Sequence, residues 1–119
     1  MKDIIVKVII ETWALDKEEK IRACKIVENA GADCVKTTTG VKTQYLYEIN
    51  NNPIGATVED IILMRSILGK NMKIKASGGI YGLKSAIELL KAGADQLGVS
   101  KGLELINDFV SNFGNHCEI

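Results

Sequence analysis

The chain has few of the side chains that most metal sites and nucleophilic sites require. Only His116 is a histidine among its 119 residues, and Cys24, Cys34 and Cys117 show no Cys-x-x-Cys spacing. Zinc sites and histidine-based catalytic triads therefore have almost nothing to build on, and we expect no metal and no cofactor. Three unpaired cysteines without a disulfide pattern are typical of reduced thiols, which predicts a cytoplasmic protein.

Charge of one sign, aromatic rings and long apolar runs are also scarce. Fifteen Lys and Arg residues balance fifteen Asp and Glu residues, and aromatic residues make up 5% of the chain. The protein thus has no net charge to attract nucleic acid or an acidic membrane, and few rings to stack on bases. The apolar runs fall far short of the ~20 residues of a membrane helix, and the start of the chain lacks a signal-peptide core. We expect neither nucleic-acid nor membrane partners.

What the chain does have is a strand pattern followed by a helix pattern, repeated four times. We predict strands at 6–12, 34–38, 72–76 and 96–99, and helices at 16–31, 57–69, 83–91 and 103–113. The β-branched run at 6–12 is typical of a strand buried on both faces. Asp16 and Glu19 have the spacing of a capping box at the start of the first helix. Consecutive strand–helix units favour an α/β fold with parallel strands and right-handed crossovers. A mass of 13.0 kDa supports one hydrophobic core, so residues 1–119 are predicted to form a single domain.

A short motif occurs twice in the chain. Residues 30–33 (AGAD) recur as residues 92–95, and Gly40 recurs as Gly102 at the same offset. The offset spans two strand–helix units, which is the period expected when barrels of such units grow by duplication. Chance similarity between short Gly-Ala turns is the alternative.

Two lysines interrupt the buried-strand patterns. Lys36 and Lys75 each end a short apolar run, and each is followed by small residues, at 37–40 and 76–79. Burial of an ammonium group is costly and favours the neutral amine. Two such lysines, each beside a turn suited to anion binding, indicate carbonyl chemistry on a phosphorylated substrate. Alternatively, both side chains reach the rim of the fold as ordinary surface charges.

Several segments together resemble a known enzyme family. They are residues 7–12 (KVIIET), 35–40 (VKTTTG), 55–60 (GATVED), 74–80 (IKASGGI) and 92–100 (AGADQLGVS). In this order they resemble the C-terminal half of deoxyribose-phosphate aldolase, a class I aldolase built on a (β/α)₈ barrel. The four strand segments are similar to that family's fifth to eighth strands. The resemblance covers nearly the whole chain and implies half of a TIM barrel.

The resemblance also implies a reaction and a set of site residues. Lys36 occupies the position of the amine that forms a Schiff base with the aldehyde, and Lys75 that of a second lysine, whose charge favours the neutral amine. The implied reaction is cleavage of 2-deoxyribose 5-phosphate to glyceraldehyde 3-phosphate and acetaldehyde, a step of deoxyribonucleotide catabolism. Phosphate is expected in the loops after the last strands, as in many TIM barrels. The candidate phosphate-binding residues are Gly40, Gly78, Gly79, Gly98 and Ser100.

The chain also departs from the family. A full barrel has eight strands in about 250 residues, and the strand that carries the family's catalytic aspartate has no counterpart here. Neither Glu11 nor Asp33 matches the motif of that aspartate, and Glu11 and Lys7 are interpreted as structural. Lys101 replaces a residue that is usually small. The loop 41–53 is longer than usual, and it would suit a lid, a contact arm or a plain solvated loop.

Half a barrel leaves two strand edges without partners. A two-fold homodimer would close both edges with one repeated interface, and we predict such a dimer. Two functions remain open: a class I aldolase, or a catalytically impaired half-barrel that binds phosphosugars or is a relic of a full-length aldolase. An open flavodoxin-like sheet is the structural alternative, although it gives Lys36 and Lys75 no role.

Overall fold

A computed structural model describes residues 3–40, 53–114 and 116 of the chain. The elements, in order, are β1 (Lys7–Ile9), a 3₁₀ helix η1 (Thr12–Ala14), α1 (Lys17–Asn29), β2 (Cys34–Lys36), α3 (Val58–Ile67), β3 (Lys73–Ser77), α4 (Leu83–Ala92), β4 (Gln96–Gly98) and α5 (Gly102–Phe113). Nearly all of the loop 41–53 lies outside the described residues, and so does Cys117. Within the described part of the chain, no helix is both long enough and apolar enough to cross a membrane.

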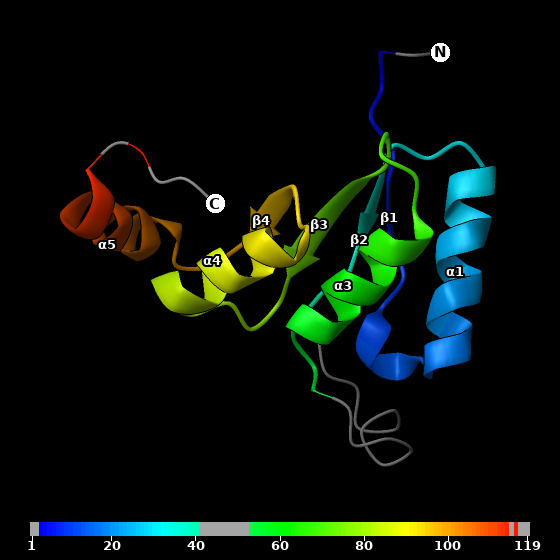
Figure 1. The fold of residues 1–119 in the computed structure, drawn as a ribbon, viewed down its shortest axis with the longest axis horizontal. Coiled ribbons are helices and arrows are strands. Elements are labelled where there is room, and N and C mark those ends of the chain that lie inside the picture. Colours follow the sequence, from blue (N-terminus) through cyan, green and yellow to red (C-terminus); the bar gives the residue numbers. More distant parts are fainter. Residues whose placement is uncertain (1–2, 41–52, 115, 117–119) are drawn as a thin grey trace.

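The four strands form one parallel sheet in the order β1-β2-β3-β4 (Figure 1). Every predicted strand and helix is present, so four strand–helix units in series are confirmed. Local signals define the helix starts: Asp16 and Glu19 form the expected capping box at α1, and Thr57 caps α3 by accepting a hydrogen bond from the Asp60 backbone N–H. The sheet and helices together are half of a (β/α)₈ barrel.

The hydrophobic core lies between the sheet and the helices on one of its faces. Val35 and Ile74 are in register on neighbouring strands and fully buried. They pack in one cluster with apolar side chains of the helices, including Cys24, Ile61, Met64 and Leu89. Alternate residues of a strand point to opposite faces, so Lys36 and Lys75, each one position further along, lie on the other face.

That second face of the sheet is open. Lys7, Ile9, Lys73 and Gln96 are exposed on it. The prediction that the first strand is buried on both faces was therefore wrong, because helices cover only one face. The strand is also shorter than predicted, since the chain turns at Glu11 and enters η1. In a closed barrel this open face would be the inner wall.

The repeated motif has the same local structure in both places. The Gly31 N–H donates to Glu28 O at 3.0 Å, and the Gly93 N–H donates to Leu90 O at 3.1 Å. The aspartate that ends each copy also plays the same part in both. Its carboxylate accepts a hydrogen bond from a backbone N–H in, or just before, the strand that precedes the copy. Asp33 accepts from Val6 and Asp95 from Ile74, both at 2.9 Å. Residues 30–33 and 92–95 are thus a structural as well as a sequence repeat.

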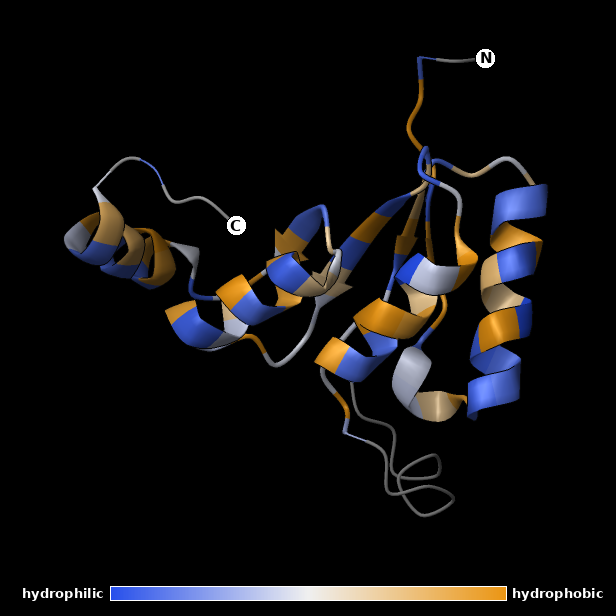
Figure 2. Cartoon of the chain, viewed as in Figure 1, coloured by the Kyte–Doolittle hydropathy of each residue, from blue (hydrophilic) through white to orange (hydrophobic). Residues whose placement is uncertain are grey.

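Exposed apolar side chains gather at both ends of the sheet. At the β4 end, α5 lies next to α4 and apart from α1 and α3 (Figure 1), and it has no buried residue. Leu103, Ile106, Val110 and Phe113 of α5 are exposed. At the other end, Figure 2 shows a hydrophobic segment leading into β1, and its residues Ile4, Ile5 and Val6 are 50–70% exposed. Both ends of the half-barrel therefore present apolar surface to solvent.

Candidate functional site

The strand register places the two candidate lysines side by side. Lys36 on β2 and Lys75 on β3 are direct Cα partners in the parallel ladder. Residues in register on parallel strands point to the same face, and neighbouring strands are about 4.8 Å apart. Both lysines are half-buried. The sheet thus places the two lysines at the same height of its open face.

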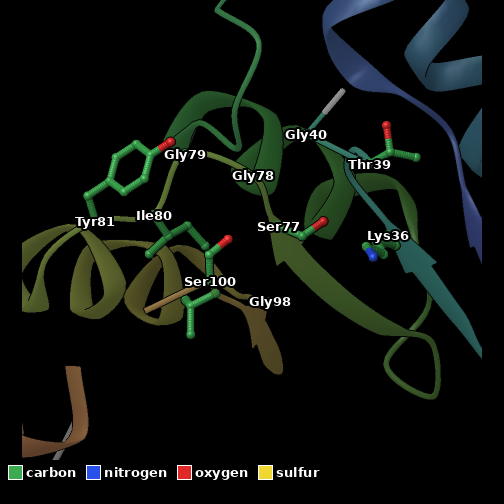
Figure 3. Close-up of a pocket in the computed structure, with 11 residues that line it drawn as sticks. Lys36, Thr39, Gly40, Ser77, Gly78, Gly79, Ile80, Tyr81, Gly98 and Ser100 are labelled. Atoms are coloured by element: carbon green, nitrogen blue, oxygen red, sulfur yellow. The ribbon is translucent and has the colours of Figure 1, made fainter. Parts of the chain in front are cut away.

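A hollow of about 350 Å³ lies at the carboxyl ends of β2, β3 and β4 (Figure 3). Six of the seven predicted site residues line it: Lys36, Gly40, Gly78, Gly79, Gly98 and Ser100. Lys75 does not line the hollow, but its Cε lies beside it: a Cβ added at Gly98 would be 3.2 Å from that atom. The structure therefore brings together residues from three separate loops that the sequence had proposed as one site.

Some residues that line the hollow were not among the site residues predicted from the sequence. Thr39, Ser77 and Tyr81 also line it. Thr39 and Ser77 each lie within three residues of a candidate lysine, so their hydroxyl groups could have been proposed as anion ligands. Tyr81 follows the Gly78-Gly79 turn, and its orientation depends on how that turn is folded. Lys101 is exposed and is not among the lining residues.

Glycine is required at the wall of the hollow formed by the loop after β3. Gly78 and Gly79 have φ values of 90° and 68°, in the region that disfavours other residues. A Cβ at Gly78 would also lie 2.7 Å from the methyl carbon of Thr38. This backbone form lets successive N–H groups turn toward a bound anion.

Replacing Gly78 with alanine is expected to weaken the binding of an anion such as inorganic phosphate in the hollow about tenfold or more, because the loop must shift to relieve the contact with Thr38. NMR titration would measure the dissociation constant. Gly82→Ala is the matched control, since Gly82 has an extended backbone with φ −154° and a methyl group added there would meet nothing within 4 Å. Equal affinity of the two variants would contradict this role of the loop.

Hydrogen bonds fix the strand ends beneath the hollow. The Thr37 hydroxyl donates to Ser77 O and accepts from the Ser77 N–H, both at 3.0 Å. The Ser77 hydroxyl donates to Thr38 O. All three residues are buried. These bonds join the ends of β2 and β3 just beyond their lysines, so they fix the spacing of the two strands where the lysines lie.

Comparison with known proteins shows what the chain is similar to. No protein-family model matches it. A curated deoxyribose-phosphate aldolase of Caldanaerobacter subterraneus subsp. tengcongensis is 47% identical over 107 residues, which are 90% of this chain and 42% of that protein. Another, from Aciduliprofundum boonei, is 50% identical over 101 residues, 85% of this chain and 41% of that protein.

The chain resembles one part of deoxyribose-phosphate aldolase. It spans less than half the length of the curated relatives that it matches. Solved structures agree. An aldolase described as QR15 superposes with a TM-score of 0.76 at 40% identity, over 88% of this chain and 43% of that one. The deoxyribose phosphate aldolase of Aeropyrum pernix, described as a unique tetramer, gives a TM-score of 0.74 at 32% identity, over 90% and 42%.

No acidic residue lies in register with the two lysines on the four strands. The row that contains them consists of Ile9, Lys36, Lys75 and Gln96. Among the described residues that line the hollow, none carries a carboxylate. In the described ranges, moreover, no group of three or more His, Cys, Asp or Glu residues is placed to hold a metal ion. The polar side chains of the described residues around the hollow are thus the amine of Lys36 and the hydroxyl groups of Thr39, Ser77, Tyr81 and Ser100.

The cysteines near the sheet are poor nucleophiles. Burial raises the pKa of the Cys24 thiol to about 11. Cys34 lies in the open-face row below Lys36, and burial raises the pKa of its thiol as well, although Lys7 and Lys75 oppose that effect. The thiolate is the reactive form of cysteine. Burial therefore disfavours attack on a carbonyl by either of these two thiols.

Proposed function

We propose that the chain is a deoxyribose-phosphate aldolase-like lyase in which Lys36 forms a Schiff base with 2-deoxyribose 5-phosphate. The observation that carries the proposal is the in-register pairing of Lys36 with Lys75 beside a glycine-rich hollow. Lys36 would supply the amine that attacks the carbonyl, and Lys75 lies in register beside it on the neighbouring strand. The proposed setting is deoxyribonucleotide catabolism in the cytoplasm.

The proposed reaction begins when Lys36 Nζ attacks C1 of the open-chain sugar and water is lost, leaving an iminium. The C2–C3 bond then breaks, its electron pair forming an enamine. At the same time the C3 hydroxyl loses its proton and becomes the aldehyde of glyceraldehyde 3-phosphate. Protonation at C2 and hydrolysis release acetaldehyde and restore the amine. Lys75 is the group beside Lys36 that can exchange protons.

The phosphate of the substrate would sit across the loops that follow β3 and β4. Backbone N–H groups of Gly78 and Gly79 and the hydroxyl of Ser100 are the proposed donors, and Gly98 leaves room for close approach. Figure 3 shows Lys36 on β2 and Ser100 in the loop that follows β4, at different sides of the hollow. A sugar phosphate could thus place its phosphate at one side and its carbonyl near the amine.

We also propose that two copies of the chain close one barrel. A two-fold axis along the barrel would place β4 of one copy beside β1 of the other, twice. The exposed residues of α5, including Ile106 and Val110, would then meet the apolar segment at Ile4 and Ile5. Closure would pair both sheet edges and cover the open face.

A second candidate function is a catalytically impaired half-barrel that binds phosphosugars, or a relic of a longer aldolase. The absence of a carboxylate from the row of Ile9, Lys36, Lys75 and Gln96 favours it. Proton removal from the C3 hydroxyl contributes separately to the barrier. We therefore expect imine formation to be faster than turnover.

The test is to incubate the chain with 2-deoxyribose 5-phosphate, reduce with borohydride and measure the intact mass. One reduced adduct per chain, located on Lys36 by peptide mapping, is expected. Binding of the sugar phosphate without any adduct would favour the impaired half-barrel, and an adduct on another lysine would contradict the assignment of Lys36. Release of acetaldehyde, measured separately, tells whether the chain also completes the reaction.

A further inference from the structure

Glu11 has a backbone conformation that its side chain must compensate. It is the only non-glycine residue with a positive φ in the described part of the chain, with φ 54° and ψ 63°. Residues with a Cβ adopt this left-handed form at a cost of roughly 1 kcal/mol or more. The residue lies two positions beyond β1, at the end of the barrel wall where the hollow opens. Such strain at a site edge raises the question of what the carboxylate does.

The carboxylate of Glu11 collects donors from two directions. Oε1 accepts from Trp13 Nε1 at 2.9 Å, from the Thr39 N–H at 3.2 Å and from the Thr38 hydroxyl; Oε2 accepts from the Thr39 hydroxyl at 2.8 Å. Partial burial alone would raise the pKa of Glu11, but the bonds from Thr38, Thr39 and Trp13 together lower it. The group is thus an ionised acceptor held inside a ring of donors.

What these bonds fix is the segment that follows Lys36. Thr39 and Gly40 line the hollow, and the Gly40 N–H donates to the Thr38 hydroxyl at 3.0 Å. The Thr38 methyl group in turn lies against Gly78. Glu11 therefore acts on both the loop after β2 and the loop after β3, although it does not line the hollow itself.

We propose that Glu11 is a positioning residue, which holds residues 38–40 as one wall of the phosphosugar site. The inference rests on the proposed function, because it assumes that the hollow binds a sugar phosphate. The strained backbone brings the carboxylate to Thr38 and Thr39, and Trp13, which is 1% exposed, anchors it from the buried side. Without this acceptor the two threonines lose the partner that they share, and the wall loosens.

The test compares Glu11→Gln with the control Glu88→Gln, which removes an exposed carboxylate on α4. The uncharged amide keeps the size of the side chain but also presents donors to Thr38 and Thr39. We expect the dissociation constant for 2-deoxyribose 5-phosphate to rise about tenfold in Glu11→Gln and to stay unchanged in the control. Trapping of acetaldehyde, which has no phosphate, should stay within twofold of the wild-type yield.

A double variant distinguishes positioning from general damage. If Glu11 acts through Thr39, the changes Glu11→Gln and Thr39→Val remove the same interaction. The double variant should then have about the same dissociation constant as the single variant that binds less tightly. Additive losses, or unchanged affinity of Glu11→Gln, would overturn the proposal. Should Glu11→Gln not fold, Glu11→Asp keeps the charge but cannot reach Thr39 and gives the same comparison.

The inference and the proposed function fail in different ways. One possible result is that the wild type binds the sugar phosphate more tightly than Glu11→Gln but yields no adduct. This result would support the positioning role of Glu11 and exclude the Schiff base. A chain that forms the acetaldehyde adduct on Lys36 but binds the sugar phosphate equally well in Glu11→Gln does the reverse. If the wild type does not bind the sugar phosphate at all, the positioning role is overturned together with the site.

Discussion

Replacement of Lys36 by alanine is expected to abolish the borohydride-trapped adduct, a loss of at least about hundredfold, since no covalent intermediate can form without that amine. Lys36→Arg should fail equally, because a guanidinium stays protonated and does not form an imine. The two variants separate the chemistry of the amine from its charge. Intact mass after reduction, with thermal unfolding to show that each variant folds, is the measurement.

Neighbouring lysines supply the controls for this result. Lys73 lies on the same face of β3 one row below, beside Cys34, and is exposed. Lys73→Ala should leave the adduct unchanged. Lys75→Ala should slow its formation about tenfold to hundredfold without abolishing it, because Lys75 can exchange protons with the groups bonded to Lys36 but does not itself bond to the aldehyde. An adduct that persists in Lys36→Ala and maps to Lys75 would exchange the two roles.

Local signals made much of this fold predictable. The capping box of Asp16 and Glu19 and the Thr57 cap act within one helical turn, so the sequence alone identifies them. The lysines could be proposed because each interrupts an apolar run. What could not be predicted depends on long-range contacts. Glu11 bonds to residues 27 and 28 positions away, and its left-handed turn, which ends β1 early, has no local sequence signature.

The first strand was expected to be buried on both faces, and its exposure in the structure has a physical explanation. Residues 4–10 are almost entirely apolar, as in strands buried on both faces. In the structure Ile5, Val6 and Ile9 are nevertheless 41–70% exposed, because helices cover only one face. The sequence pattern describes a strand in a closed barrel, and a single chain provides half of one. This mismatch between pattern and exposure is independent support for a partner on the open side.

A charge on α5 is expected to separate the proposed dimer. Ile106 is 61% exposed and would be covered in a closed barrel, so Ile106→Glu should weaken association about hundredfold or more, since an unpaired charge would be buried in an apolar contact. Light scattering across a concentration series would measure it. Ile62→Glu is the matched control: Ile62 is 55% exposed, but it lies on α3, away from both sheet edges.

Closure by a second copy also has an electrostatic consequence. Each copy brings Lys7, Lys36, Lys73 and Lys75 to the inner wall. In the row that holds Lys36 and Lys75, the other two residues are the uncharged Ile9 and Gln96. Two such faces repel each other, so association should strengthen with salt, and more with inorganic phosphate than with chloride at equal ionic strength. A chain that stays monomeric under all these conditions would overturn the dimer. Its lysines would then face solvent, where water reaches any imine, and the phosphosugar-binding half-barrel would be the better account of the site.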